Sequence, residues 1–143
     1  MPETLKKVYG IDLGTTYSCI ALVDETGKPV ILRNDDNEPI TASVVFFDND
    51  NVVVGRVAKE NAELQPDNVV EMVKRSMGDP NYLFQHGDKS YRAEEISAFI
   101  LRKLAGDVQK QTNEAVTDVV ITVPAYFGVN EKEATAKRVR LPG

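Results

Sequence analysis

A long amphipathic helix that leads into an apolar strand constrains this fold more than any other feature. The sequence predicts a helix over Ala93–Thr112, because its apolar residues recur at three- and four-residue spacing (Ile96, Phe99, Ile100, Leu104 and Val108). Val119–Val123 (VVITV) predicts a strand in a sheet that is covered on both faces. Such a helix is a crossover between neighbouring strands, and the natural neighbour of Val119–Val123 is Val8–Leu13.

The first part of the chain is rich in short strands. Val8–Leu13, Tyr17–Asp24 and Pro29–Leu32 are separated by turn sequences and predict an antiparallel meander. Two further runs flank a polar turn and predict a hairpin, Ser43–Phe47 and Asn51–Gly55.

Helices and one more hairpin are predicted in the remaining segments. We expect short helices over Arg56–Leu64 and Val69–Met77, and a hairpin around Gly87-Asp88. Asn130 is a candidate cap for a helix that runs towards Arg140. The chain is therefore predicted to be α/β, with a mixed sheet that contains an antiparallel meander.

Composition excludes several classes of protein. Apolar residues make up 42% and charged residues 27% of the 143 residues, as in an ordinary globular domain. The net charge of −5 argues against a nucleic-acid binder, which would normally carry a basic face. No apolar run approaches the ~20 residues needed to span a bilayer, so no membrane partner is expected. Cys19 is the only cysteine, which excludes an internal disulfide and fits a reducing compartment.

The segment GIDLGTTYS, residues 10–18, carries the clearest chemistry. Asp12 lies in a strand that is otherwise predicted to be buried, where a lone carboxylate is costly unless it meets a cation or donors. Gly14 permits a sharp turn, and the residues after it offer successive backbone N–H groups (Thr15, Thr16 and Tyr17). Such a nest of donors can hold a triphosphate, and a nearby carboxylate can hold the water shell of Mg²⁺.

A plain hairpin whose Asp and Thr residues close the turn explains the same composition. The chain contains neither a GxxxxGK[ST] P-loop nor a GxGxxG dinucleotide motif. His86, the only histidine, is expected at a hairpin surface, and Cys19 is expected to be an inert thiol in a core strand.

GIDLGTTYS resembles the first phosphate motif of the Hsp70 chaperones, which belong with actin and the sugar kinases to one superfamily of ATPases. Val73-Lys74-Arg75 and the segment ITVPAYF, residues 121–127, are also similar to Hsp70 and occur in the same order. The resemblance covers nearly the whole chain and implies an actin-like ATPase lobe with a ribonuclease H-like fold.

The resemblance assigns roles to individual residues. Asp12 resembles the carboxylate that orients the water shell of Mg²⁺, and Lys74 resembles the lysine beside the γ-phosphate and the attacking water. The loop around the β- and γ-phosphates corresponds to Gly14, Thr15, Thr16 and Tyr17, and Thr16 joins Asp12 and Lys74 as a catalytic candidate. A point cation at Lys74 can offset charge that develops during phosphoryl transfer. From the residues alone, a solvated lysine at a helix end is the favoured interpretation of Lys74.

Two further residues resemble an interdomain relay. Pro124 corresponds to a proline that transmits the nucleotide state, although a proline also simply ends a strand. Lys132 stands where the family usually has arginine, and lysine lacks the planar, forked donor geometry of arginine.

The resemblance also implies a division of the chain and a cellular role. Residues 1–36 and 113–143 would form the inner subdomain of the first ATPase lobe, and residues 37–112 the outer one. The implied cofactors are ATP or ADP and Mg²⁺, and the implied activity couples ATP hydrolysis to binding and release of unfolded polypeptides. The expected partners are polypeptide clients, a J-domain cochaperone and a nucleotide exchange factor, in the cytoplasm.

Two other classes of function stay open from the sequence. A sugar kinase or actin relative would share the Asp-Gly-Thr turn but lack Val73-Lys74-Arg75 together with ITVPAYF. A non-catalytic interaction module would expose an apolar patch around Val123–Val129 and could self-associate. Because the second phosphate loop and the adenosine pocket of the family are not in this sequence, we expect the chain alone to hydrolyse no measurable ATP.

Overall fold

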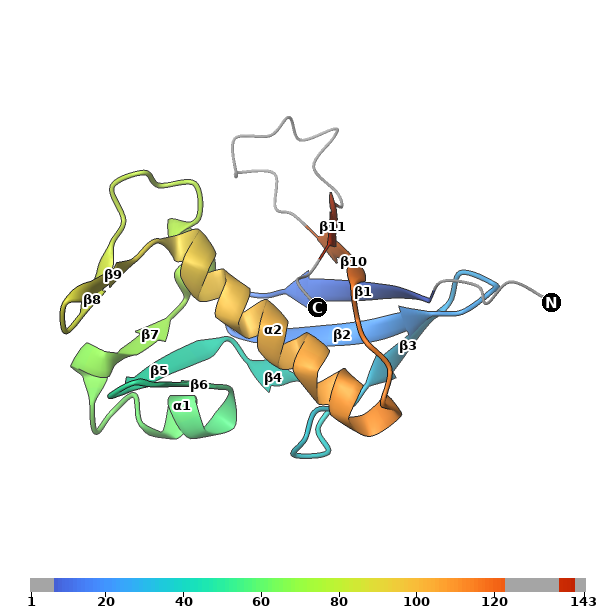
Figure 1. Ribbon diagram of the computed structural model, residues 1–143, viewed down its shortest axis with the longest axis horizontal. Coiled ribbons are helices and arrows are strands. Elements are labelled where there is room, and N and C mark those ends of the chain that lie inside the picture. The colour runs from blue at the N-terminus through green and yellow to red at the C-terminus, as the bar shows by residue number, and fades with distance from the viewer. Residues whose placement is uncertain (1–6, 123–136, 141–143) are drawn as a thin grey trace.

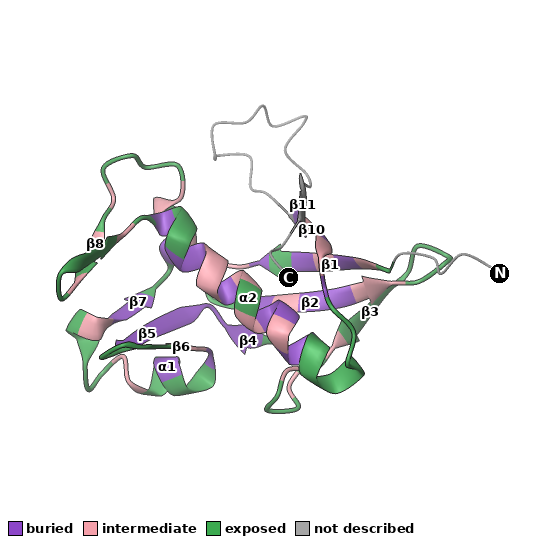
Figure 2. Ribbon diagram, in the orientation of Figure 1, coloured by how far each residue is buried: buried purple, intermediate pink, exposed green. Residues whose placement is uncertain are grey.

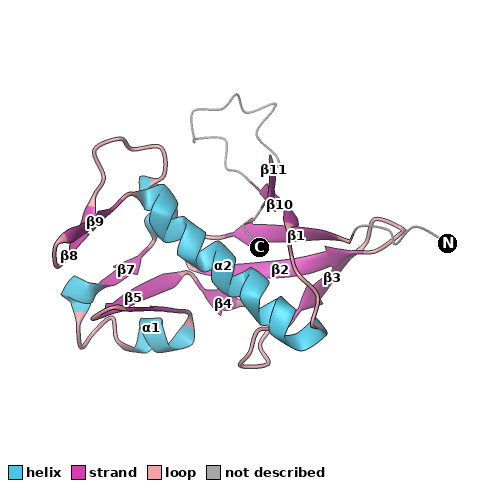
Figure 3. Ribbon diagram, in the orientation of Figure 1, coloured by secondary structure: helices cyan, strands magenta, loops and turns pink. Residues whose placement is uncertain are grey.

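The computed structural model describes residues 7–122 and 137–140. Within these ranges the strands form three sheets of six, three and two strands. The long helix α2 (Ala93–Thr112) crosses them and lies along the larger sheets (Figures 1 and 3). None of the described helices combines the length and the apolar character needed to cross a membrane.

The six-stranded sheet begins with the predicted meander. β1 (Val8–Leu13), β2 (Tyr17–Val23) and β3 (Pro29–Leu32) are antiparallel neighbours, and the two-residue strand β4 (Thr41–Ala42) pairs with the start of β2. β10 (Asp118–Thr122) lies parallel to β1, with Gly10 opposite Val120. The predicted crossover through α2 is therefore confirmed.

The last described strand corrects one prediction. β11 (Lys137–Arg140) pairs antiparallel with the free side of β10, so the helix predicted from Asn130 towards Arg140 is wrong over residues 137–140. The physical reason is that the outer edge of β10 presents unpaired backbone groups, which a short extended segment can satisfy. Residues 130–136 of that predicted helix lie outside the described part of the chain.

The three-stranded sheet contains the second predicted hairpin and one strand that was not predicted. β5 (Val44–Asp48) lies between β6 (Asn51–Val54) and β7 (Val69–Glu71). The predicted helix over 69–77 is wrong, because the β-branched pair at its start completes this sheet and only Val73–Ser76 forms a short 3₁₀ helix, η2. β8 (Phe84–His86) and β9 (Lys89–Tyr91) form the hairpin predicted around Gly87.

Two apolar clusters fill the space between these layers. α1 (Arg56–Glu60), shorter than predicted and followed by the 3₁₀ helix η1 (Pro66–Asn68), packs its buried Ala58 against Val44 and Phe46 of β5. The other face of β5 packs with α2 and the six-stranded sheet, which we call the inner sheet, in the larger cluster. Phe47 of this face is 2% exposed. β5 is therefore buried on both faces, which explains its continuous apolar sequence.

The two faces of the inner sheet differ in how they are covered. Tyr9, Ile11 and Leu13 of β1 are buried in the larger cluster on the side of α2, whereas Asp12 on the opposite face is exposed (Figure 2). Val119 and Ile121 of β10 follow the same alternation, being buried while the intervening Val120 is only half-buried. Among the described residues, the predicted coverage on both sides is thus complete on one face only.

The arrangement of sheets bears on the predicted subdomains without testing their boundaries. The inner sheet takes strands from both ends of the chain, and the two smaller sheets lie between Val44 and Tyr91. The division into residues 1–36 plus 113–143 and residues 37–112 stays a prediction.

Candidate phosphate site at the β1–β2 turn

The turn between β1 and β2 is too tight for any side chain at its first position. A Cβ atom added to Gly14 would lie 2.0 Å from the carbonyl oxygen of Tyr17, far inside contact distance. Gly14 is therefore required by the backbone itself, because the chain folds back on Tyr17. Thr16 is exposed and Thr15 is half-buried, so this turn lies at the surface of the sheet.

The backbone of the turn is anchored from the side of β4. Tyr17 and Ser18 pair with Ala42 and Thr41, and the Ser43 N–H donates to the carbonyl oxygen of Thr16 at 2.9 Å. The buried hydroxyls of Ser18 and Ser43 share a hydrogen bond of 2.7 Å. These contacts fix the position of the turn without using the N–H groups of Thr15 and Thr16 as ladder donors.

Asp12 stands two residues before the turn, on the open face of the sheet. Its carboxylate is exposed and forms no hydrogen bond or ion pair within the described ranges. Cys19 lies opposite it on β2, half-buried rather than buried as predicted. Burial raises the pKa of the Cys19 thiol and the nearby Asp12 carboxylate raises it further, so the thiol stays protonated and unreactive at neutral pH.

The described residues contain no group of three or more His, Cys, Asp and Glu side chains placed to hold a metal ion. A metal at Asp12 would therefore take most of its ligands from water and from a bound phosphate. That fits Mg²⁺, which keeps several waters and is commonly held by one or two carboxylates plus substrate phosphates.

Lys74 follows an unusual backbone conformation. Met72, between β7 and η2, has a φ of 56° in the left-handed region, and Lys74 follows in the first turn of η2. Lys74 is half-buried, and no anionic partner for its ammonium group lies among the described residues.

A small hollow connects the turn to the segment that leads to Lys74. It has a volume of about 50 Å³, and its lining includes Thr15 and Thr16 from the turn and Glu71 and Met72 from the end of β7. Segments more than fifty residues apart in sequence are thus neighbours at this site. The lining of the hollow ends at Met72, two residues before the predicted catalytic lysine, and Lys74 itself is not part of it.

Lys59 also lines this hollow, although no role was predicted for it. Its Nζ donates to the Tyr17 hydroxyl at 2.6 Å and lies 4.7 Å from the centre of the Tyr17 ring. A partner 42 positions away cannot be read from spacing alone.

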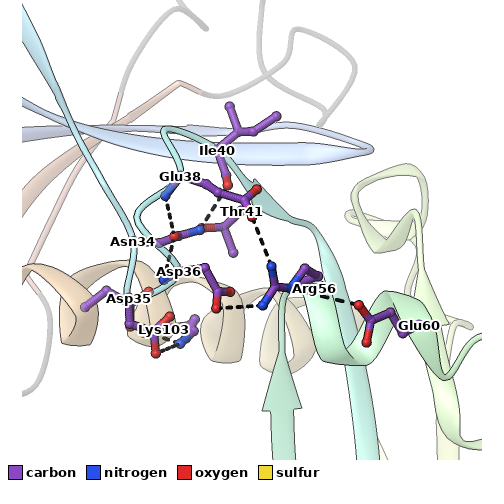
Figure 4. A network of polar contacts seen from close by, with 10 residues as sticks. Asn34, Asp35, Asp36, Glu38, Ile40, Thr41, Arg56, Glu60 and Lys103 are labelled. Carbon is purple, nitrogen blue, oxygen red and sulfur yellow. Dashed lines mark hydrogen bonds and ion pairs between the residues drawn. The ribbon is translucent and has the colours of Figure 1, made fainter.

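A second hollow of about 210 Å³ has Tyr17 and Lys59 in its lining. Charged residues of the network in Figure 4 also line it. Arg56 of α1 forms ion pairs with Asp36 at 3.1 Å and Glu38 at 3.4 Å in the loop before β4, and a longer one with Glu60. None of these ion pairs was predicted from the sequence.

Asn34 and Lys103 hold the same loop from inside and from α2. The Asn34 side chain accepts from the N–H groups of Asp36 and Glu38, and donates to Ile40 and Thr41 (Figure 4). Lys103 pairs with Asp35 at 2.9 Å and with the buried Asp107 at 3.0 Å. The hydrogen bond from Lys103 lowers the pKa of Asp35. Burial lowers the pKa of Lys103, but its bonds to the two carboxylates outweigh this and raise it overall.

Three sequence predictions concern residues outside the described part of the chain. They are the relay candidates Pro124 and Lys132 and the apolar patch Val123–Val129. His86 is half-buried against the Phe47 ring, and its Nε2 lies 3.0 Å from the carbonyl oxygen of Asn49. These contacts join the β8–β9 hairpin to the β5–β6 hairpin.

The mixed sheet, the crossover helix and the glycine turn define an α/β lobe of the actin-like ATPase type. The chain belongs to the Hsp70 protein family, whose match covers residues 8–143. It is 41% identical to the "Chaperone protein DnaK" of two strains of Thermus thermophilus, over 97% of this chain. The chain spans 26% of the length of those relatives. The match places it in the chaperone branch rather than among the sugar kinases or actins.

Proposed function

We propose that this chain is the part of an Hsp70-type ATPase that holds the phosphates of ATP or ADP. The turn from Gly14 to Tyr17 would receive the β- and γ-phosphates on its backbone N–H groups. The observation that carries this proposal is the shared hollow between the turn and the segment leading to Lys74. The hollow lies between the turn, with its backbone donors, and the segment that ends at Met72. The unpaired Lys74, two residues further on, would supply the cation that an anion of high charge requires.

Each residue of the site has a distinct part in this proposal. Mg²⁺ bound with the nucleotide supplies charge neutralisation and orients the phosphate oxygens. Asp12 would accept hydrogen bonds from water on the metal, a role that suits an exposed carboxylate without a protein partner. Lys74 would offset charge that develops on the γ-phosphate, and the Thr16 hydroxyl would lie beside the same group.

The role of the whole protein follows from the family and is also a proposal. ATP hydrolysis would drive cycles of binding and release of unfolded polypeptides, with a J-domain cochaperone and a nucleotide exchange factor as partners in the cytoplasm. Pro124 and Lys132 are proposed to relay the nucleotide state. We expect this chain by itself to hydrolyse no measurable ATP, because Asp12, Thr16 and Lys74 offer one side of a two-sided clamp.

Calorimetric titration of the purified chain with MgATP, MgADP and adenosine tests the phosphate site. We expect binding that needs the phosphates, that weakens when Mg²⁺ is chelated, and that weakens several-fold in Asp12→Asn and Lys74→Met. Lys89→Met, at an exposed hairpin lysine, is the matched control and should bind like the parent chain. Equal binding of adenosine and MgATP would contradict a phosphate site.

Two further measurements complete this test. Steady turnover of ATP by the chain that disappears in Lys74→Ala would contradict the expectation that one side of the clamp is inactive. Size-exclusion chromatography with and without MgATP separates a nucleotide-binding lobe from a self-associating interaction module. An association state that changes with protein concentration but not with MgATP, together with no nucleotide binding, would favour the interaction module.

A further inference from the structure

Tyr17 and Lys59 form the one side-chain bridge that the structure shows between the phosphate turn and α1, within the described ranges. The Lys59 ammonium donates to the Tyr17 hydroxyl at 2.6 Å and lies 4.7 Å from the ring centre, so its contact with Tyr17 is at the hydroxyl end of the ring. A hydrogen bond from a charged donor is stronger than one between neutral groups.

Lys59 is presented by a helix that is itself firmly placed. The preceding residue, Ala58, is fully buried against β5, and the Lys59 N–H donates to the carbonyl oxygen of Gly55. Arg56, one turn earlier, ties the same helix to Asp36 and Glu38 (Figure 4). The base of the Lys59 side chain therefore has little freedom, and its four-carbon stem ends on Tyr17.

Tyr17 transmits this restraint to the backbone of the turn. Its carbonyl oxygen is the atom that faces Gly14 across the turn, so a displacement of Tyr17 changes the closure of the turn directly. No carboxylate among the described residues competes for the Lys59 ammonium. Lys59 also lines both hollows, and Tyr17 lines the larger of them.

We propose that Lys59 is a positioning residue for the phosphate turn, acting through the Tyr17 hydroxyl. This inference rests on the proposed function, and the anion it concerns is the phosphate chain of a nucleotide. A turn held in its binding geometry before the ligand arrives loses less freedom on binding, and this preorganisation is a source of affinity. Lys59 thus supports binding of phosphates without touching the nucleoside.

Three variants separate this role from a simple charge effect. Lys59→Met keeps the stem and removes the ammonium, Tyr17→Phe keeps the ring and removes the hydroxyl, and the third variant combines both changes. Lys59→Arg tests rescue, because arginine also donates to oxygen and stacks on aromatic rings. Lys89→Met is again the control.

The first measurement needs no ligand. Nitrogen-15 relaxation and amide hydrogen exchange should show faster motion at Gly14–Tyr17 in Lys59→Met and Tyr17→Phe, with no further increase in the double variant. The rest of the sheet should be unchanged, which distinguishes local positioning from general loss of structure. Motion of the turn equal to that of the parent chain in both single variants would overturn the inference.

The second measurement compares ligands. Affinity for MgATP should fall about two- to tenfold in each single variant and no further in the double, as expected for one hydrogen bond. Affinity for adenosine should not change. A loss in Lys59→Met with a silent Tyr17→Phe would mean that Lys59 acts as a free cation, which also overturns the inference. If the parent chain binds no MgATP but the turn still loosens in the variants, the proposed function fails and the positioning role stands.

Discussion

At the scale of single residues, two glycines show how differently the same residue type can be used. Gly14 closes a turn in which a Cβ would overlap the Tyr17 carbonyl oxygen at 2.0 Å. Gly106 lies inside α2, where a Cβ would meet nothing within 4 Å. The sequence motif singled out the first and passed over the second, because only a turn makes glycine visible as a pattern.

Alanine substitutions at these positions should therefore have opposite effects on the free energy of unfolding. Gly14→Ala forces the turn open, and we expect a loss of about 1–3 kcal/mol together with loss of phosphate binding. Gly106→Ala removes backbone freedom in the unfolded chain and should stabilise the protein by about 0.5–1 kcal/mol. Urea unfolding of both variants checks this, and equal stabilities would show that the turn tolerates a side chain.

The predicted site residues Asp12 and Lys74 share a feature that the sequence could not reveal. Each carries a charge without a partner among the described residues, although Lys74 is only half exposed. Among the half-buried charges, Lys103 by contrast is paired with Asp35 and Asp107. A carboxylate and a cation that are both free of protein partners are what the proposed site for a phosphate and its metal needs.

At the scale of elements, the loop between β3 and β4 is organised by one side chain. Asn34 accepts from two backbone N–H groups at 2.9 and 3.0 Å, and its amide donates to two oxygens at 3.0 Å each. The polar residues of this loop are visible in the sequence, but the hydrogen bonds of Asn34 are not. Four local bonds from one residue fold the loop so that Asp36 and Glu38 meet Arg56 (Figure 4).

Removing that side chain should loosen the whole loop. We expect Asn34→Ala to lower the free energy of unfolding by about 1–3 kcal/mol, since several hydrogen bonds are lost at once. Asn68→Ala is the matched control, because the Asn68 side chain makes one bond of 3.3 Å to Gln65, and it should cost less than about 0.5 kcal/mol. Chemical denaturation measures both, and a cost for Asn34→Ala no larger than that of the control would contradict this account.

The short segments show why local patterns fail where tertiary pairing decides. Val69–Glu71 was predicted as the start of a helix, but Val70 pairs with Val45 and completes a sheet whose other strands are far away in sequence. Met72 then adopts a left-handed conformation, which no propensity predicts for methionine. The long helix α2 was predicted correctly over its whole length because twenty residues of periodicity outweigh such effects.

At the scale of the whole molecule, the sequence predicted the strand topology around the site and not the side-chain contacts that hold it. The meander, the crossover and the parallel pairing of β10 with β1 follow from periodicity and chain order. The contacts of Tyr17 with Lys59 and of Lys103 with Asp35 join residues 42 and 68 positions apart. Such pairs depend on the packed arrangement of whole elements, so no motif encodes them.

The ion pairs of Lys103 connect the loop between β3 and β4 to α2. They make the free energy of unfolding depend on pH. Asp35 has its pKa lowered from an ordinary value of 3.8, so its contribution is present above that pH and is lost as the pH falls through the lowered pKa. Lys103 has its pKa raised above 10.5, so its contribution is present below 10.5 and is lost as the pH rises through the raised pKa. Both contributions are therefore in place at neutral pH.

We expect Lys103→Met to lower the free energy of unfolding by about 1–3 kcal/mol at pH 7, because the buried Asp107 also loses its cation. The difference from the parent chain should hold down to about pH 4 and shrink below it, as Asp35 becomes protonated in both. Lys89→Met, at an exposed lysine of the β8–β9 hairpin, should give a much smaller and flatter difference. Urea unfolding at pH 7, 5 and 3 measures all three proteins, and a Lys103→Met difference that grows towards acid pH would show that this pair does not stabilise the folded chain.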